Sequence, residues 1–335
     1  MVDFRVGLPT LAVKPTNQKI ASFLKKLNLN FNVSLFFKVA QANTYIETIS
    51  NKADILHYHL NKKSPDEICF AYLKDVKSMI NKRHFPTVKI AVDYTDEDFY
   101  GESTSLYLHG WTGENGVKAH YKYFVASVVN PRKKEKIPFF IAPVRLGHSK
   151  RELFQEMFIE AKKLFRRVDL VLLDRGFYSG EVIEFFNSKN IKFLMLVPKN
   201  KHFVKLFENF DDMISLYKEI KWKANFSSQK TESKYVLIRH NFNWIFATNL
   251  EEVNAEDYIR KYKWRWQIET NFRVHDEARI KSKSINHVIR LFYFIISMLM
   301  MFIWQMKEKT HMTFKRFLIE NYEASLIKNI VVSES

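Results

Sequence analysis

The segment Asp169-Leu-Val-Leu-Leu-Asp174-Arg-Gly-Phe177 is the most informative one for the architecture of this chain. Its short apolar run, bounded by turn-forming residues, is typical of a strand that is buried on both faces. Helical patterns precede and follow it, at 149–166 and at about 179–189. We therefore expect a buried strand with helices before and after it, and an acidic residue, Asp174, at the end of the strand.

Strand patterns continue on both sides of this segment. Val88, Ile90 and Val92 alternate with less apolar residues and predict a strand that ends at Asp93. Further strands are predicted at 104–109, 119–129, 138–144 and 192–197. Three antiparallel strands followed by helix, strand, helix and strand make a mixed α/β order. We predict an α/β fold with a mixed sheet flanked by helices.

The remaining segments suggest further units around this core. Residues 1–85 contain helical periodicity over 17–83, and residues 198–250 contain strand-like runs at 235–240 and 243–247. We predict a helical domain over 1–85, which binds DNA in one reading and presents a solvated lysine-rich face in the other. The core would comprise 86–197 and 251–310, with a β-rich insertion over 198–250 and a C-terminal tail over 311–335.

Composition limits the kind of protein this is. The 335 residues suffice for two or three domains, and 47% hydrophobic residues indicate a folded chain. The net charge of +17 favours polyanionic partners, with nucleic acid first. The single cysteine, Cys69, excludes an intrachain disulfide and a cysteine-based zinc site. The absence of a signal-like N-terminus predicts a cytoplasmic, nucleoid-associated protein.

One apolar run could form a buried core helix or a helix on a membrane surface. Residues 291–304 form 14 consecutive apolar or weakly polar positions, short of the roughly 18–20 needed to cross a bilayer. We predict a buried helix and no membrane partner.

The chemistry is expected on a helix that begins at Asn254, a good N-cap, and runs over about 255–283. At about 100° per residue, Tyr262, Arg265, Glu269 and Asp276 fall within an arc of roughly 60°. That face can meet the two strand ends that carry Asp93 and Asp174. Three carboxylates suit two Mg²⁺ or Mn²⁺ ions, because hard cations prefer oxygen ligands. Such a pair of ions stabilises the attacking and leaving oxygens of a phosphoryl displacement.

These residues resemble the DDE transposases of bacterial and archaeal insertion sequences, in the branch with a Tyr-x2-Arg-x3-Glu signature and a β-strand insertion before the glutamate. The signature reads Tyr262-x2-Arg265-x3-Glu269 in this chain. The first aspartate lies in Ala91-Val92-Asp93-Tyr94, and the second in Leu172-Leu173-Asp174-Arg175-Gly176-Phe177-Tyr178. The resemblance covers about 86–290 and implies an RNase H-like catalytic core, in agreement with the predicted strand order.

The resemblance assigns roles to individual residues. Asp93, Asp174 and Glu269 would be the catalytic, metal-binding triad for two Mg²⁺ or Mn²⁺ ions. Tyr262 and Arg265 would contact DNA phosphates near the cut end, since a guanidinium can hold a phosphate bidentately. The alternative for Arg265 is an intrahelical ion pair with Glu269. The partners implied are double-stranded DNA, as terminal inverted repeats and target, and a second copy of the chain in a paired-end complex.

One position departs from the family pattern. A lysine usually stands seven residues after the glutamate, and this chain has Asp276 there. Arg273, Arg279, Lys281 or Lys283 could supply the missing phosphate contact, or Asp276 could add a fourth carboxylate near the metals. The substitution also admits an inactive copy.

Other candidates carry less weight. Asp96 and Asp98 are expected in a loop after the strand, and Trp264 and Trp266 are expected to pack rather than to stack on bases. Three functions therefore stand: a transposase, a structure-selective nuclease or resolvase on the same core, and a DNA-binding protein that has lost catalysis.

Overall fold

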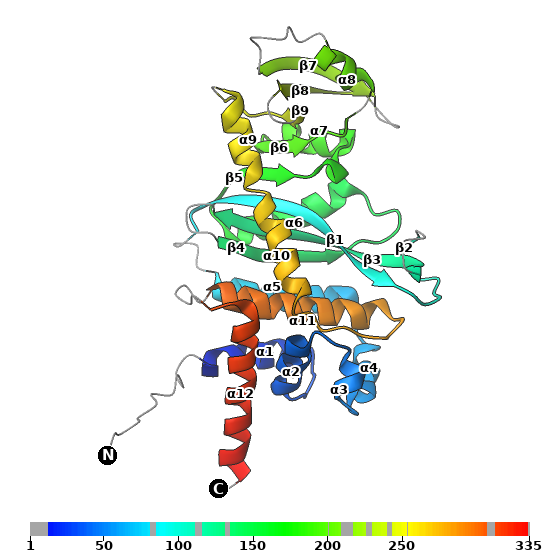
Figure 1. Cartoon of the computed structure of the whole chain (residues 1–335), viewed down its shortest axis with the longest axis vertical. Coiled ribbons are helices and arrows are strands. Elements are labelled where there is room, and N and C mark those ends of the chain that lie inside the picture. Colours follow the sequence, from blue (N-terminus) through cyan, green and yellow to red (C-terminus); the bar gives the residue numbers. More distant parts are fainter. Residues whose placement is uncertain are drawn as a thin grey trace, which may run out of the picture.

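A mixed sheet forms the centre of the computed structural model, and helices cover both of its faces (Figure 1). The structure describes residues 13–80, 85–110, 116–130, 135–199, 201–208, 217–225, 230–239, 243–252, 254–306 and 312–333. Residues 131–134 and parts of the predicted units 1–85, 198–250 and 311–335 lie outside these residues.

The sheet has nine strands among the described residues. They are β1 (Thr87–Phe99), β2 (Leu108–Gly110), β3 (Ala119–Asn130), β4 (Glu135–Pro143), β5 (Arg167–Leu173), β6 (Phe193–Leu196), β7 (Tyr217–Asn225), β8 (Lys230–Arg239) and β9 (Asn243–Thr248). Their order is β2-β3-β1-β5-β6-β9-β8-β7, and β4 also pairs with β3. Strands β1, β5 and β6 are parallel, and the other pairs are antiparallel.

Two apolar layers hold helices on opposite faces of this sheet. Alternate residues of β5 belong to different clusters: Leu170 and Leu172 to one, Val171 and Leu173 to the other. The first cluster packs under α9 (Ala255–Lys263) and α10 (Trp266–Asp276), and the second under α6 (Lys150–Leu164) and α7 (Gly180–Ser188). Side-chain alternation along a strand produces this division.

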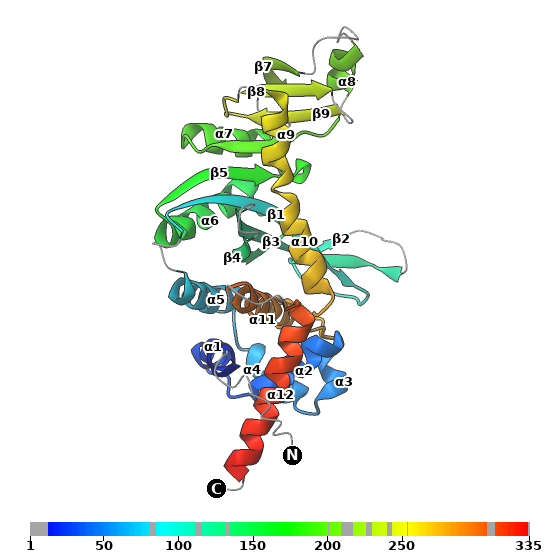
Figure 2. The ribbon, with the colours of Figure 1, turned by 60° about the vertical axis from the view of Figure 1, so that its left-hand side comes forward.

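A helical layer lies beyond β4 (Figure 2). It comprises α1 (Val13–Lys26), α2 (Val33–Ala42), α3 (Ile46–Ile49), α4 (Ala53–Leu60), α5 (Pro65–Met79), α11 (His287–Met306) and α12 (Phe314–Ser333). The short helix α8 (Lys201–Glu208) lies at the other end of the molecule, beside β7. Helix α5 begins with a capping box between Ser64 and Glu67 and with Pro65 in its first turn, as its sequence favours. The Tyr72 hydroxyl donates to the Pro138 carbonyl at 2.7 Å and joins α5 to β4.

Helix α11 is the central helix of this layer. By length and composition it could cross a membrane, but 89% of its most apolar 18-residue window is buried inside the protein. Its Phe294 stacks on Tyr123 of β3 with ring centroids 4.1 Å apart. The predicted core helix is therefore present, and it extends beyond the predicted 291–304 run at both ends.

Several predicted boundaries were wrong. Strand β1 continues through Phe99, because β3 pairs with it as far as Ala119, so Asp96 and Asp98 lie in the strand. The predicted strand at 104–109 is reduced to the edge strand β2. The predicted tail instead contains α12, whose Phe317 and Leu318 are buried.

The predicted helix over 255–283 is two helices. It begins at Asn254 as expected, since the Asn254 side chain accepts from the Asp257 amide at 3.0 Å. At Trp264 and Arg265 the backbone amides bond three residues back, to Lys261 and Tyr262, and α10 then ends at Asp276. Such i−3 bonds tighten the helix locally. Arg265 therefore lies at the tight turn between α9 and α10.

Candidate active site

The three predicted carboxylates lie on three different elements that meet at one place. Asp93 lies within β1, one residue after its parallel pairing with β5 stops at Val92, so the prediction that the strand itself ends there was wrong. Asp174 directly follows β5 and precedes a short 3₁₀ turn, Arg175–Phe177. Glu269 lies in the first turn of α10. The parallel register thus places both aspartates at the same edge of the sheet, next to this helix.

The guanidinium of Arg265 lies between the three carboxylates. Its Nη1 donates to Asp93 Oδ2 at 2.9 Å, and its Nη2 bonds Glu269 Oε1 and lies 3.9 Å from Asp174 Oδ1. The Arg265 side chain is only 6% exposed. The intrahelical pair with Glu269 is therefore present, as one part of a larger cluster.

Tyr262 closes the cluster from the side of α9. Its hydroxyl accepts from Arg265 Nε at 3.0 Å and donates to Asp174 Oδ1 at 3.4 Å. The ring packs against Trp244 and Phe246 and is 1% exposed. The predicted contacts of Tyr262 and Arg265 with DNA remain predictions, because both side chains are buried here against protein groups.

Burial and charge alter the ionisation of this cluster. Burial raises the pKa of Asp93 to about 6, against the opposing effect of Arg265 and with a further increase from Asp174 and Glu269. Burial also raises the pKa of Tyr262. For Arg265, burial acts to lower the pKa, but Tyr262 and the carboxylates together raise it. Arg265 is thus a permanent cation among the three acids.

A hollow of about 670 Å³ opens beside the cluster. Asp93 and Glu269 contribute to its wall, together with Arg273 and Asp276 from α10. Its other lining residues are Asn43, Tyr94, Phe272 and Glu277. Asp93 and Glu269 are therefore open to a bound molecule from this side.

The donor set fits a hard divalent cation, since three carboxylates supply only oxygen ligands. Within the part of the chain that the structure describes, however, no group of three or more His, Cys, Asp or Glu side chains is close enough to hold a metal ion in its present arrangement. Arg265 lies among these acids, and its nitrogens contact carboxylate oxygens that a metal would need. The residues present fit the metal, and the guanidinium occupies their centre.

The other predicted DNA-contacting residues are Arg273, Lys281 and Lys283, and one of them reaches the hollow. Arg273 lines it and is exposed. Lys281 and Lys283 follow α10 on an extended segment that joins the N-terminal helices: the Lys281 amide donates to the Thr44 carbonyl, and the Lys283 ammonium lies 5.7 Å from the centre of the Tyr45 ring. Arg273 is thus the predicted cation at the hollow, and Lys281 and Lys283 lie on the neighbouring segment.

Asp276 lies on the rim of the hollow, not inside the cluster. It is 3.4 Å from His275 Nδ1 and 3.5 Å from Arg279 Nη1. Partial burial acts to raise its pKa, but His275 and the cations Arg279 and Lys281 lower it overall. It is an ionised carboxylate on the path to the triad.

Sequence reasoning missed Asn43, which borders the hollow from the N-terminal helices. Its side-chain nitrogen donates to the Asp276 carbonyl at 3.1 Å, and its backbone is left-handed, with φ 47°. An asparagine in that conformation is a common end of a helix, here α2. That signal predicts the end of the helix, and nothing in it indicates that the residue faces the triad.

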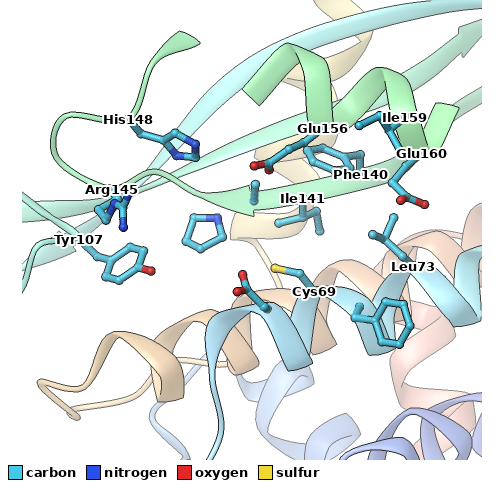
Figure 3. A pocket seen from close by; sticks show the side chains of 14 residues that line it. Cys69, Leu73, Tyr107, Phe140, Ile141, Arg145, His148, Glu156, Ile159 and Glu160 are labelled. Atoms are coloured by element: carbon cyan, nitrogen blue, oxygen red, sulfur yellow. The ribbon is translucent and has the colours of Figure 1, made fainter. Parts of the chain in front are cut away.

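A second hollow, of about 500 Å³, lies between α5, β4 and α6. Cys69 and Leu73 of α5 face Glu156 and Ile159 of α6 across it (Figure 3). Burial raises the pKa of the Cys69 thiol and of Glu156, so both groups are held toward their neutral forms. A neutral thiol is a poor nucleophile. None of the predicted site residues reaches this hollow.

The sheet order is that of an RNase H-like fold, and on it Asp93, Asp174 and Glu269 gather around Arg265. Residues 100–304 match the family model described as the transposase DDE domain, so the chain belongs to that family. The match contains Asp174 and Glu269 and begins seven residues after Asp93. Members of this family generally use divalent metal ions and act on DNA.

A solved structure supports the fold. The chain is similar to a cryo-EM structure of a piggyBac transposase synaptic complex with hairpin DNA, at 13% identity and a TM-score of 0.56. The similarity covers 95% of this chain and 78% of that one. No curated protein matches the sequence.

Proposed function

We propose that the protein is a DNA transposase that binds the terminal inverted repeats of its element, hydrolyses a phosphodiester to free a 3′-hydroxyl, and transfers that hydroxyl to target DNA. The observation that carries the proposal is the convergence of Asp93, Asp174 and Glu269 around one cation, beside a large open hollow. A plain nuclease does not require the Tyr262–Arg265 pair that accompanies the triad.

The three carboxylates would hold two Mg²⁺ or Mn²⁺ ions, which supply charge neutralisation at the attacking and leaving oxygens. The chain itself contributes position and electrostatics. Asp93 and Asp174 are fixed by adjacent parallel strands, and Glu269 by a helix that packs on the same sheet. Arg273, Lys281 and Lys283 would guide the phosphate backbone along the rim of the hollow, and Arg265 and Tyr262 would hold phosphates next to the cut.

The helices within 1–85 would provide further DNA contacts, and a second copy of the chain would complete a paired-end complex. Helix α2 ends at Asn43 on the hollow, so this part of the chain reaches the site directly. The net charge of +17 favours association with a polyanion and a nucleoid location.

The decisive experiment is a cleavage assay on duplexes taken from the DNA on either side of the coding sequence, with Mg²⁺, Mn²⁺ or EDTA. We expect metal-dependent nicking at the repeat boundary by the natural chain, and no nicking by Asp174→Asn or Glu269→Gln. Binding of the same duplexes should remain, because neither change removes a cation. Asp169→Asn is the matched control: Asp169 lies at the other end of β5, paired with Lys89, and this variant should cleave normally.

Nicking that persists in Asp174→Asn would refute the assignment of the triad. Binding without nicking by the natural chain would favour a DNA-binding descendant without catalysis. Asp276 is the observation that supports this second candidate, because a carboxylate stands on the rim of the hollow where the family usually has a lysine.

A further inference from the structure

We propose that Arg265 is a displaceable internal cation: its guanidinium holds the three carboxylates in place before metal binds, and metal and Arg265 compete for the same oxygens. This inference rests on the proposed function, because it assumes that the triad is the metal site. Arg265 would thus be a positioning residue for the empty site as well as a phosphate-binding residue in the loaded one.

The first observation is the completeness of the contacts. Arg265 lies within ion-pair distance of all three acids, and its remaining nitrogen, Nε, donates to the Tyr262 hydroxyl at 3.0 Å. The side chain is 6% exposed, so water solvates little of its charge. A buried guanidinium is stable only when acids surround it, and these acids are equally in need of a cation.

The second observation concerns the spacing of the acids. As arranged, no three acidic, histidine or cysteine side chains among the described residues can hold an ion together. The three carboxylates are suitable metal ligands, but their present positions match a guanidinium and not a metal ion. Metal binding requires the oxygens to turn away from Arg265 and toward the ion.

The third observation is that the hollow beside the cluster offers space for a displaced Arg265 side chain. It lies at the tight turn between α9 and α10, and the neighbouring hollow is lined by its partners Asp93 and Glu269 and by Arg273. A phosphate in that hollow would offer the displaced guanidinium a new anion. Binding of metal and binding of DNA would then favour each other, because each one favours the state in which Arg265 has left the triad.

The expected change in metal affinity follows from the fraction of molecules in which Arg265 contacts all three acids. If the guanidinium occupies the triad in about 90% of molecules, the apparent metal affinity is reduced about tenfold. Arg265→Gln should therefore raise the affinity for Mn²⁺ about tenfold or more, while it lowers DNA cleavage because the phosphate contact is lost. A purely structural residue would lower both.

The test measures free Mn²⁺ by electron paramagnetic resonance during titration of the DNA-free full chain. Arg273→Gln is the matched control: it removes the same charge from the hollow without touching the triad, and its affinity should stay within about twofold of the natural chain. Thermal melting in EDTA should show a lower melting temperature for Arg265→Gln than for the natural chain. Addition of Mn²⁺ should restore the lost stability of the variant. If Arg265→Gln does not fold, Arg265→Lys, which cannot bridge three carboxylates, should show a smaller increase in affinity.

The outcomes separate the two proposals. Affinity in Arg265→Gln equal to or below that of the natural chain, or equal increases in Arg265→Gln and Arg273→Gln, would overturn the competition while the metal site stands. Absence of Mn²⁺ binding in the natural chain and in Arg265→Gln, or binding that survives Asp174→Asn, would instead overturn the metal site of the proposed function.

Discussion

At the scale of single residues, Arg265 joins acids from three different elements. The helical spacing grouped Tyr262, Arg265, Glu269 and Asp276 on one face, and the structure brings the first three together while Asp276 lies on the rim of the hollow. The Arg265–Glu269 pair was the alternative that a four-residue separation offered for Arg265. The contact of Arg265 with Asp93 joins residues 172 positions apart. Periodicity carries no information on such a pair, so the position of the guanidinium among all three acids came only from the fold.

Asp276 gives a prediction at this scale. Replacing Asp276 with lysine removes a negative charge and adds a positive one on the rim of the hollow, so we expect tighter binding of element-end DNA. One additional phosphate contact should steepen the slope of log K against log salt by about 0.9. Asp276→Asn, which removes the repulsion only, should raise affinity with little change in slope. Fluorescence anisotropy across a salt series measures both, and an unchanged slope in Asp276→Lys would place residue 276 away from the DNA.

At the scale of elements, the buried strands and helices were predicted because their apolar patterns are strong. Strand β5, helix α6 and helix α11 lie close to their expected positions. Strand β1 was predicted too short, because Asp96 and Asp98 look like loop residues, and pairing with β3 keeps them in the sheet. Cross-strand pairing overrides local preference in this way.

The join between α11 and β1 gives the second prediction. Arg290 of α11 donates to Glu97 of β1 at 2.9 Å, and Glu97 also accepts from the Tyr123 hydroxyl at 3.0 Å. Glu97 is 6% exposed and Arg290 8%. Arg290→Met leaves a buried carboxylate without its cation and should lower the free energy of unfolding by about 3–5 kcal/mol.

A second change should compensate for the first. In the double variant Glu97→Gln, Arg290→Met the buried charge is gone, and the amide oxygen can still accept from Tyr123, so most of the lost stability should return. Urea unfolding of the natural chain, both single variants and the double variant measures the coupling. A double variant no more stable than Arg290→Met would show that the ion pair is not the source of the loss.

At the scale of the whole molecule, one continuous sheet joins parts that the sequence suggested were separate. Strand β9, from the predicted insertion, pairs with β6 of the core, and β8 and β7 extend the sheet beyond it. At the other end, α12 packs with α1, α2 and α11, so residues near the two ends of the chain share one core (Figure 2). The sequence indicated the amphipathic helices but not their partners, because many pairings bury similar faces.

The last prediction follows from this shared core. Phe317 of α12 is 2% exposed, so Phe317→Ala should lower the free energy of unfolding by about 3–5 kcal/mol through lost burial and a cavity. Leu326 lies on the same helix and is 41% exposed, so Leu326→Ala should change stability by about 0.5 kcal/mol or less. Urea unfolding at one temperature compares the two. Because α12 meets α2, and α2 ends at Asn43 on the hollow, Phe317→Ala should also weaken DNA binding more than Leu326→Ala does. Equal stability of the two variants would mean that burial of Phe317 in α12 does not stabilise the shared core.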